Sequence, residues 1–428
     1  MAHKLAIVDT NALANKGSYA RLAGLLKAIN TNLPEYEVTI FHRYYDEVTK
    51  DTIEDLKKFH SDIRVRKHPW YNEKKSTVYT TISFLFFFTS HAIQQMTIQK
   101  RKTFFYDFDA ILDLNLIEPD SFNDKKIILK NIFGQLFVLL SIWNLSLSKK
   151  KVIICSATIG PYTSSLLEFL ARRILNKVSL ITLREAFSRD YLNSIEINKP
   201  KIHVTADLAF LMEINEDINF SIISKLLNLQ KDMGVIIGIC PAAMMNSMLH
   251  EDEYIQLLSD LSDFLIEETD ATILYLANTF QDISLVEKIY SVVKNPQKTR
   301  IVPFSASARE IKSVIGICNL FICSRFHALV ASTSIGTPSI GLISYSYNKF
   351  HGIIGGMMKQ EQNLLDIDAN FNYNAFLNEL KIKSEYLLKH EGSVRSDLLN
   401  NFNFTKEKAL LNGQLIRNVI SEKYAKGN

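Results

Sequence analysis

Three residues in the second half of the chain could together bind an anionic substrate and exchange a proton with it. Arg325 and His327 follow the apolar run Leu320–Cys323, which has the composition of a buried strand. Lys349 follows a second run of this kind, residues 338–344. Arginine binds carboxylates and phosphates through paired hydrogen bonds, lysine supplies a compact positive charge, and histidine exchanges protons near neutral pH. These residue types suit a substrate that carries both a carboxylate and a phosphate.

The elements around these residues would bring them together. A small-residue helix is predicted after Arg325, closed by Gly336 and followed by Pro338, so the chain runs strand, helix, strand. In an open α/β sheet, ligands bind at the carboxyl ends of the strands, where helix N-termini favour an anion. We therefore expect Arg325, His327 and Lys349 to line one pocket at such an edge.

Short apolar strands alternate with helices through both halves of the chain, and the alternation restarts after Phe220. The predicted strands are 4–9, 37–41, 63–65, 110–114, 151–156, 180–183 and 202–205, then 234–240, 271–276, 300–302, 320–323 and 338–344. This alternation predicts parallel sheets with right-handed crossovers, and 428 residues exceed what one core usually supports. We predict two Rossmann-like α/β domains, residues 1–212 and 213–372, and a helical tail, residues 373–428, that packs across them.

The motif around the cluster resembles the C-terminal signature of the polysaccharide pyruvyl transferase family. It consists of SRFHAL from Ser324, GTP from Gly336, and Lys349. The resemblance implies a GT-B-like pair of Rossmann-type domains. It also implies a reaction, the transfer of pyruvate from phosphoenolpyruvate to two hydroxyls of a sugar as a ketal.

The resemblance assigns roles to the residues of this motif. His327 and Arg325 would be catalytic, with His327 as the general acid or base, and Ser324 and Lys349 would bind the donor. Phosphoenolpyruvate would be a co-substrate, and no further cofactor is implied.

Two matches in the first half of the chain add donor-binding candidates. Gly160 lies in a Gly-Pro turn at a strand exit, where a glycine lets the backbone approach a ligand. Arg184 follows the strand 180–183 in a Leu-Arg-Glu motif, and the resemblance places it at the phosphoenolpyruvate site. An ion pair with Glu185 or Asp190 is the structural alternative for Arg184.

The N-terminal turn matches the family in part. Asn15 and Gly17 occupy positions that the resemblance links to acceptor binding, but Ser18 stands where an acidic residue is usual. Ser18 is alternatively the N-cap of a helix that begins near Tyr19. The turn at Asn115 also lacks the family's glycines, which leaves open a carbohydrate-binding relative without catalytic activity.

Composition excludes several classes of protein. The net charge of +4 is small, and the absence of a long basic run argues against a nucleic-acid partner. The four cysteines lie in or beside apolar runs, as reduced thiols of cytoplasmic proteins do. No metal site is predicted, because the histidines are scattered and the cysteine spacings match no zinc pattern. The apolar stretch at the N-terminus ends at Asp9 and is too short for a signal peptide.

Two apolar segments raise the question of membrane contact. Residues 82–88 are far short of the about 20 residues that span a bilayer, and residues 127–147 carry polar side chains. We expect both to be buried. A peripheral contact at the inner face of the membrane stays open, because a sugar acceptor could be lipid-linked. Trp70 and Tyr71, in the polar loop before these segments, could stack on a sugar or pack on their own domain.

The predicted function is therefore a cytoplasmic transferase of polysaccharide biosynthesis that builds exopolysaccharides or the cell envelope. A GT-B glycosyltransferase that uses a nucleotide sugar is the alternative enzyme, because it would use the same cations for a diphosphate. The acceptor sugar, its linkage and the oligomeric state are left open by the sequence.

Overall fold

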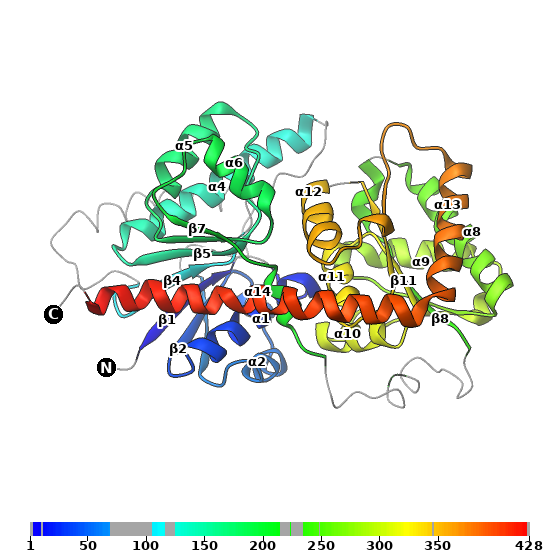
Figure 1. Cartoon of the computed structure of the whole chain (residues 1–428), viewed down its shortest axis with the longest axis horizontal. Coiled ribbons are helices and arrows are strands. Elements are labelled where there is room, and N and C mark those ends of the chain that lie inside the picture. The colour runs from blue at the N-terminus through cyan, green and yellow to red at the C-terminus, as the bar shows by residue number, and fades with distance from the viewer. Residues whose placement is uncertain are drawn as a thin grey trace. The chain divides into compact units, whose positions relative to one another are not determined.

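The computed structural model describes residues 3–9, 12–68, 105–115, 125–214, 223, 234–247, 249–344 and 346–425. Two compact units share the chain: the first contains Met1–Leu13, Arg21–Leu211 and Lys408–Asn428, and the second contains Ala14–Ala20 and Met212–Glu407. Each unit has one parallel β-sheet with helices between its strands (Figure 1). The predicted fold class, two Rossmann-like α/β domains, is confirmed.

The sheet of the first unit has seven strands in the order β3-β2-β1-β4-β5-β6-β7. Its strands are β1 (Lys4–Asp9), β2 (Glu37–His42), β3 (Ile63–Lys67), β4 (Ala110–Asp113), β5 (Lys151–Ala157), β6 (Leu180–Leu183) and β7 (Lys201–Val204). The central strands are buried on both faces, as in β4 and β6, where every residue is buried. This explains their continuous apolar runs, because parallel sheets are covered by helices on both sides.

The helices of the first unit connect these strands. They are α1 (Lys16–Asn32), α2 (Lys50–Lys57), α4 (Lys125–Leu147), α5 (Ser165–Leu175) and α6 (Ala186–Ser194), with the 3₁₀ helices η1 (Tyr45–Glu47) and η3 (Leu208–Leu211). In this order β2 and β3 follow β1 on one side, and β5, β6 and β7 follow β4 on the other. Right-handed crossovers therefore place α1 and α2 on one face of the sheet and α4 to α6 on the other, as Figure 1 shows.

The sheet of the second unit has six strands in the order β10-β9-β8-β11-β12-β13. Its strands are β8 (Ile236–Cys240), β9 (Thr272–Tyr275), β10 (Thr299–Ile301), β11 (Leu320–Cys323), β12 (Ser339–Ile343) and β13 (Leu364–Asp366). All pairings are parallel, and the register of the central pair aligns Cys323 with Cys240. From β8 the chain adds β9 and β10 on one side, and it adds β11, β12 and β13 on the other, so the strand order reverses between β8 and β11. Folds of this kind bind ligands at the carboxyl ends of the two strands that flank the reversal.

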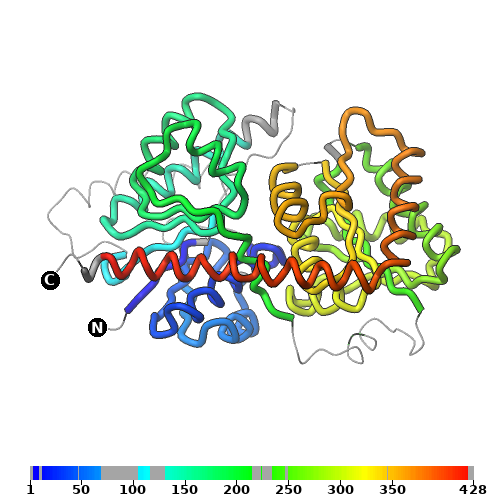
Figure 2. Tube along the Cα trace, in the orientation of Figure 1, coloured from blue at the N-terminus to red at the C-terminus, as the bar shows by residue number. Residues whose placement is uncertain are grey.

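The helices of the second unit pack on this sheet, with α8 against α9 and α10 against α11. They are α8 (Glu251–Thr269), α9 (Ile283–Val292), α10 (Ala308–Gly316), α11 (Phe326–Ser334), α12 (Tyr347–Lys349) and α13 (Tyr373–Lys389). Shorter elements are the 3₁₀ helices η4 (Ala243–Ser247), η5 (Phe280–Asp282), η6 (Pro296–Lys298) and η8 (Glu361–Asn363), and the π-helix η7 (Phe350–Met357). Figure 2 traces the path of the chain through these elements.

The division into units departs from the order of the chain at two places. Residues 14–20 pack with the second unit, although both of their chain neighbours belong to the first. The long helix α14 (Glu391–Ala425) belongs to the second unit up to Glu407 and to the first unit from Lys408. In the first unit, its buried Asn412 accepts hydrogen bonds from Thr182 (2.5 Å) and Thr205 (3.2 Å).

Some predictions fall on residues that the structure does not describe. Trp70, Tyr71 and residues 82–88 lie outside the described residues, as does the chain directly after Asn115. Within the described part of the chain, no helix combines the length and the apolar character needed to cross a membrane.

Two basic side chains of α10 hold the chain where it enters the second unit. The buried Lys312 donates a hydrogen bond of 2.6 Å to the carbonyl of Met212, and Arg309 donates to the carbonyls of Glu213 (3.3 Å) and Ile214 (2.8 Å). Burial lowers the pKa of Lys312 to about 7, while Glu213 raises it and Lys406 lowers it further.

This buried lysine predicts a pH-dependent stability. An unfolded chain keeps its lysines protonated up to about pH 10, so between about pH 7 and about pH 10 the unfolded state binds more protons than the folded state. Across this window, the free energy of unfolding of the wild-type protein should therefore rise with pH by more than that of Lys312→Met. Denaturant titrations of both proteins at about pH 6.5 and about pH 9 measure the difference. The prediction would be contradicted if the difference in free energy of unfolding between the wild type and Lys312→Met were the same at both pH values. The exposed Lys294→Met is the control, and its difference from the wild type should not change with pH.

Candidate functional site

Arg325 lies at the carboxyl end of β11, where the strand order reverses. It is the residue before α11, with an extended backbone (φ −104°, ψ 118°) that turns the chain from strand to helix. Because β8 pairs with β11 on one side and β12 pairs with it on the other, Arg325 occupies the centre of this sheet edge. The predicted position of the arginine at a strand exit is therefore the observed one.

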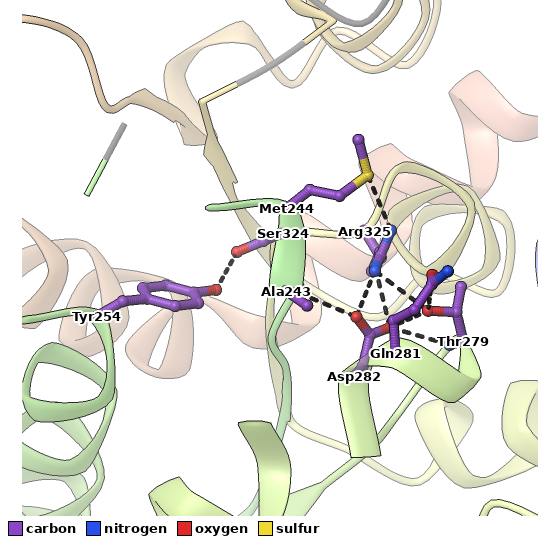
Figure 3. A network of polar contacts seen from close by, with 8 residues as sticks. All are labelled: Ala243, Met244, Tyr254, Thr279, Gln281, Asp282, Ser324 and Arg325. Atoms are coloured by element: carbon purple, nitrogen blue, oxygen red, sulfur yellow. Dashed lines mark hydrogen bonds and ion pairs between the residues drawn. The ribbon is translucent and has the colours of Figure 1, made fainter. Parts of the chain in front are cut away.

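Asp282 fixes the guanidinium of Arg325 (Figure 3). Nε of Arg325 donates to Oδ2 of Asp282 at 3.0 Å, and Nη2 donates to Oδ1 in the same ion pair. Nη2 also donates to the hydroxyl of Thr279 at 3.2 Å, and Nη1 contacts the sulfur of Met244 at 3.4 Å. Asp282 is fully buried and Arg325 nearly so. Two parallel hydrogen bonds hold the plane of the guanidinium.

The turn that carries Asp282 is itself closed by the same carboxylate. The backbone N–H and the hydroxyl of Thr279 each donate to Oδ2 of Asp282 at 2.9 Å, which forms a capping box at η5. The N–H of Ala243, after β8, donates to Oδ1 at 3.1 Å. Asp282 thus connects the chain after β8 and the chain after β9 to the arginine after β11. Thr279 and Asp282 were not among the site residues predicted from the sequence, although Thr-x-x-Asp before a helix is a capping pattern.

His327 lies against the N-terminal turn of α1. The side-chain oxygen of Asn15 accepts hydrogen bonds from the N–H groups of Gly17 (3.0 Å) and Ser18 (3.4 Å). Asn15 is therefore the cap of a helix that begins at Lys16. The proposed capping role of Ser18 was wrong, because Ser18 lies inside this helix. A Cβ atom at Gly17 would lie 2.2 Å from Nδ1 of His327. Only glycine allows this close approach to the imidazole.

Lys16 attaches this turn to the second unit. Its ammonium group donates to the carbonyls of Phe304 (3.1 Å) and Ala306 (2.6 Å), and its backbone N–H donates to the carbonyl of Asn278 (3.3 Å). Burial lowers the pKa of Lys16 to about 8, against an opposing effect of Glu310. These bonds explain why residues 14–20 belong to the second unit.

The hydroxyl of Ser324 points into the protein. It shares a hydrogen bond of 2.6 Å with the hydroxyl of Tyr254, and both residues are buried (Figure 3). Burial raises the pKa of Tyr254, so this phenol stays protonated. The donor-binding role of Ser324 remains a prediction.

Lys349 and His327 flank one aromatic ring. The ammonium group of Lys349 lies 5.5 Å from the centroid of Phe326, and the His327 ring meets the same phenylalanine edge to face at 5.1 Å. Phe326 also packs on Phe350, which directly follows the lysine. The second unit therefore brings together Arg325, His327 and Lys349 at the end of its sheet, together with the turn of Asn15 and Gly17. Their catalytic and binding roles remain predictions.

Arg184 and Gly160 belong to the first unit. Arg184 is fully buried, and it donates to Asp207 (2.6 Å) and to the hydroxyl of Thr158 (2.7 Å). Its ion-pair partner is thus neither of the carboxylates suggested by sequence proximity. Glu185 caps α6 through the N–H of Ser188 (2.8 Å), and Asp190 pairs with Arg189.

Gly160 has a left-handed backbone (φ 83°), and a Cβ atom there would lie 2.1 Å from the ring of Tyr191. The group that approaches this glycine in the structure is therefore a side chain of its own unit. At the turn without glycines, the N–H and the side-chain amide of Asn115 donate to Asp113 at 2.8 and 2.7 Å. These bonds fix Asn115, the last described residue before that turn.

No group of three or more histidine, cysteine, aspartate or glutamate side chains in the described parts of either unit is arranged to hold a metal ion. The chemistry that the described site can supply comes from hydrogen-bond donors, an imidazole and positive charges.

Comparison with known proteins connects this geometry to a family. The model of the family described as polysaccharide pyruvyl transferase matches residues 15–347. The amylovoran biosynthesis protein AmsJ of Erwinia amylovora is 22% identical over 224 residues, which is 50% of this chain and 52% of that protein. The match therefore spans about half the length of this relative.

Solved structures share the fold at low sequence identity. The UDP-GlcNAc 2-epimerase of Neisseria meningitidis superposes with a TM-score of 0.59 at 11% identity, over 98% of this chain and 100% of that one. A UDP-glucosyltransferase of Polygonum tinctorium gives 0.58 at 10% identity, over 98% and 99% of the two chains. These likenesses show the GT-B-type fold alone. The family match, which covers most of the chain including the Arg325 and His327 motif, identifies the chain as an enzyme of the polysaccharide pyruvyl transferase family.

Proposed function

We propose that this enzyme transfers pyruvate from phosphoenolpyruvate to two hydroxyls of one sugar, forming a cyclic ketal. The proposal is supported mainly by the cluster of Arg325, His327 and Lys349 near the reversal point of the second sheet, of which Arg325 and His327 lie within the matched family region. Phosphoenolpyruvate carries a carboxylate and a phosphate, which these donors and charges suit.

The reaction has two carbon–oxygen bond-forming steps. A proton adds to the methylene carbon of phosphoenolpyruvate, which becomes the methyl group, and the adjacent carbon becomes electrophilic. One sugar hydroxyl attacks this carbon and loses its proton, and phosphate leaves with the electron pair of its bond to carbon. The second hydroxyl then attacks the same carbon and loses its proton. One of the two released protons balances the one that carbon received, and the other leaves with phosphate.

His327 is the proposed proton carrier in these steps. Its ring is half-buried between the Gly17 turn and Phe326, which restricts its orientation. A positioned histidine can give a proton to carbon and take one from a hydroxyl.

The cations have different proposed roles because of their partners. Arg325 is paired with a buried carboxylate, so it supplies oriented hydrogen bonds and little net charge. Lys349 is the proposed source of net positive charge for the donor. Arg184, paired with Asp207 in the first unit, would act in the same way as Arg325.

The acceptor proposed here is a sugar diol of an exopolysaccharide or cell-envelope polysaccharide precursor. Phosphoenolpyruvate is a cytoplasmic metabolite, so the reaction would take place in the cytoplasm, at the inner face of the membrane if the acceptor is lipid-linked. Asn15 and Gly17, which lie beside His327, keep their predicted role at the acceptor.

A ligand screen tests the donor. Phosphoenolpyruvate should raise the melting temperature of the enzyme by mass action, because a ligand that binds only the folded state stabilises it. UDP-GlcNAc and UDP-glucose serve as competitors for the alternative enzyme. Protection by a nucleotide sugar and none by phosphoenolpyruvate would contradict the proposal and favour a glycosyltransferase.

His327→Ala should reduce turnover by about 10²–10⁴-fold, which is the usual contribution of a positioned acid or base. His327→Gln, which has a similar reach but does not titrate, should lose nearly as much. Phosphate release and ketal formation are measured with melting temperature, and His203→Gln, at an exposed position, is the matched control. A folded His327→Gln enzyme with full activity would refute the acid–base role.

Asp282→Asn should lower both stability and turnover. The amide can no longer accept hydrogen bonds at both oxygen positions, and a buried arginine without its counter-charge costs about 3–5 kcal/mol. Displacement of Arg325 should cost at least about tenfold in turnover, since small misplacements of binding groups have such effects. The exposed Asp252→Asn is the control. Unchanged melting temperature and activity in Asp282→Asn would show that the pair does not position Arg325.

A further inference from the structure

Phe280 is unusually exposed for a phenylalanine beside a buried polar network. Its side chain is 77% exposed, the largest value among the exposed large hydrophobic residues of the described part of the chain. Its chain neighbour Thr279 and the nearby Asp282 both bind Arg325. Single exposed apolar residues are common on protein surfaces, so exposure by itself carries no meaning. The position of this ring within the turn that holds Arg325 is the informative observation.

The turn fixes the backbone on both sides of Phe280. Thr279 and Asp282 form the capping box, and the N–H of Ala243 ties the same carboxylate to the chain after β8. The backbone N–H of Lys16 donates to the carbonyl of Asn278 at the start of the turn. The ring of Phe280 is therefore exposed on a rigid base, which lowers the entropy cost of binding a ligand.

A second aromatic ring supports it from the protein side. Phe280 meets Phe304 at 6.5 Å between centroids, with the ring planes at 69°. Lys16 lies 4.7 Å from the centroid of Phe304 and donates a hydrogen bond to its carbonyl. Phe304 is thus held by the same lysine that attaches the His327-contacting turn. An edge-to-face contact leaves a face of an aromatic ring available to a ligand.

The proposed reaction requires an acceptor close to Arg325. Both hydroxyls of the sugar bond to one carbon of the donor, so the sugar ring must lie directly beside the donor. Successive Cα atoms are about 3.8 Å apart, so Phe280 is one such step from Thr279, a residue that binds Arg325. A sugar ring presents one face of C–H groups, which carry partial positive charge and bind to the negative face of an aromatic ring.

We propose that Phe280 is an acceptor-binding residue whose ring stacks on the apolar face of the acceptor's pyranose ring. This inference rests on the proposed function, because that reaction places the sugar beside Arg325. It adds Phe280 to the proposed acceptor contacts Asn15 and Gly17, which belong to the same unit.

Binding without turnover tests this assignment. Saturation-transfer NMR is recorded with the whole enzyme and methyl galactopyranoside or methyl glucopyranoside, and with glycerol as a diol that has no ring. The wild-type enzyme should transfer saturation to the ring C–H protons of a sugar and not to glycerol. Phe280→Ala should weaken sugar binding about tenfold, which corresponds to about 1.4 kcal/mol. Phe280→Trp should restore it, because tryptophan offers a larger face.

Matched controls separate this role from stability. Phe404→Ala removes another exposed phenylalanine of the second unit and should leave sugar binding unchanged. Phe280→Ala should keep its melting temperature and its protection by phosphoenolpyruvate, because the ring is exposed and contacts no donor-binding residue in the proposal.

The outcomes also distinguish this inference from the proposed function. Equal sugar binding in Phe280→Ala and wild type, equal transfer to glycerol, or no transfer to either sugar would overturn the assignment of Phe280. If phosphoenolpyruvate does not raise the melting temperature of the wild-type enzyme, the result concerns the donor and would overturn the proposed function.

Discussion

The buried ion pair of Arg325 and Asp282 organises the candidate site. One carboxylate accepts hydrogen bonds from the guanidinium, from Thr279 and from the N–H of Ala243, so it joins the ends of β8, β9 and β11 at the reversal point of the sheet. A buried pair of this kind contributes little net stability, but removing one partner is costly. Its main effect here is to give Arg325 a single orientation.

Charge compensation follows a common pattern in the two units. Arg325 is paired with Asp282, and the fully buried Arg184 is paired with Asp207. The charge of each arginine is therefore largely neutralised by a buried carboxylate. An anionic donor would obtain its net electrostatic attraction from Lys349 and from the helix N-terminus beside His327, where backbone N–H groups carry partial positive charge.

Local sequence patterns predicted most elements, and long-range contacts account for most of what was missed. The strands Leu180–Leu183 and Leu320–Cys323 were predicted with their observed bounds, because apolar runs mark them. The edge strand β13, in which only two apolar residues precede an aspartate, was not predicted. Asp282 lies 43 positions from Arg325, and Lys16 bonds to residues nearly 300 positions away. No spacing rule predicts such partners, so the sequence alone does not show that residues 14–20 pack with the second unit.

The central claim is that this site converts the enol carbon of phosphoenolpyruvate into a ketal. The most direct measurement is ¹³C NMR of phosphoenolpyruvate labelled at its second carbon, incubated with the enzyme and a panel of sugar diols, including lipid-linked sugars. The account predicts that the labelled carbon moves from the enol to the ketal region as phosphate is released. A carbon that remains an enol across the panel, while the enzyme releases UDP from a nucleotide sugar, would contradict it.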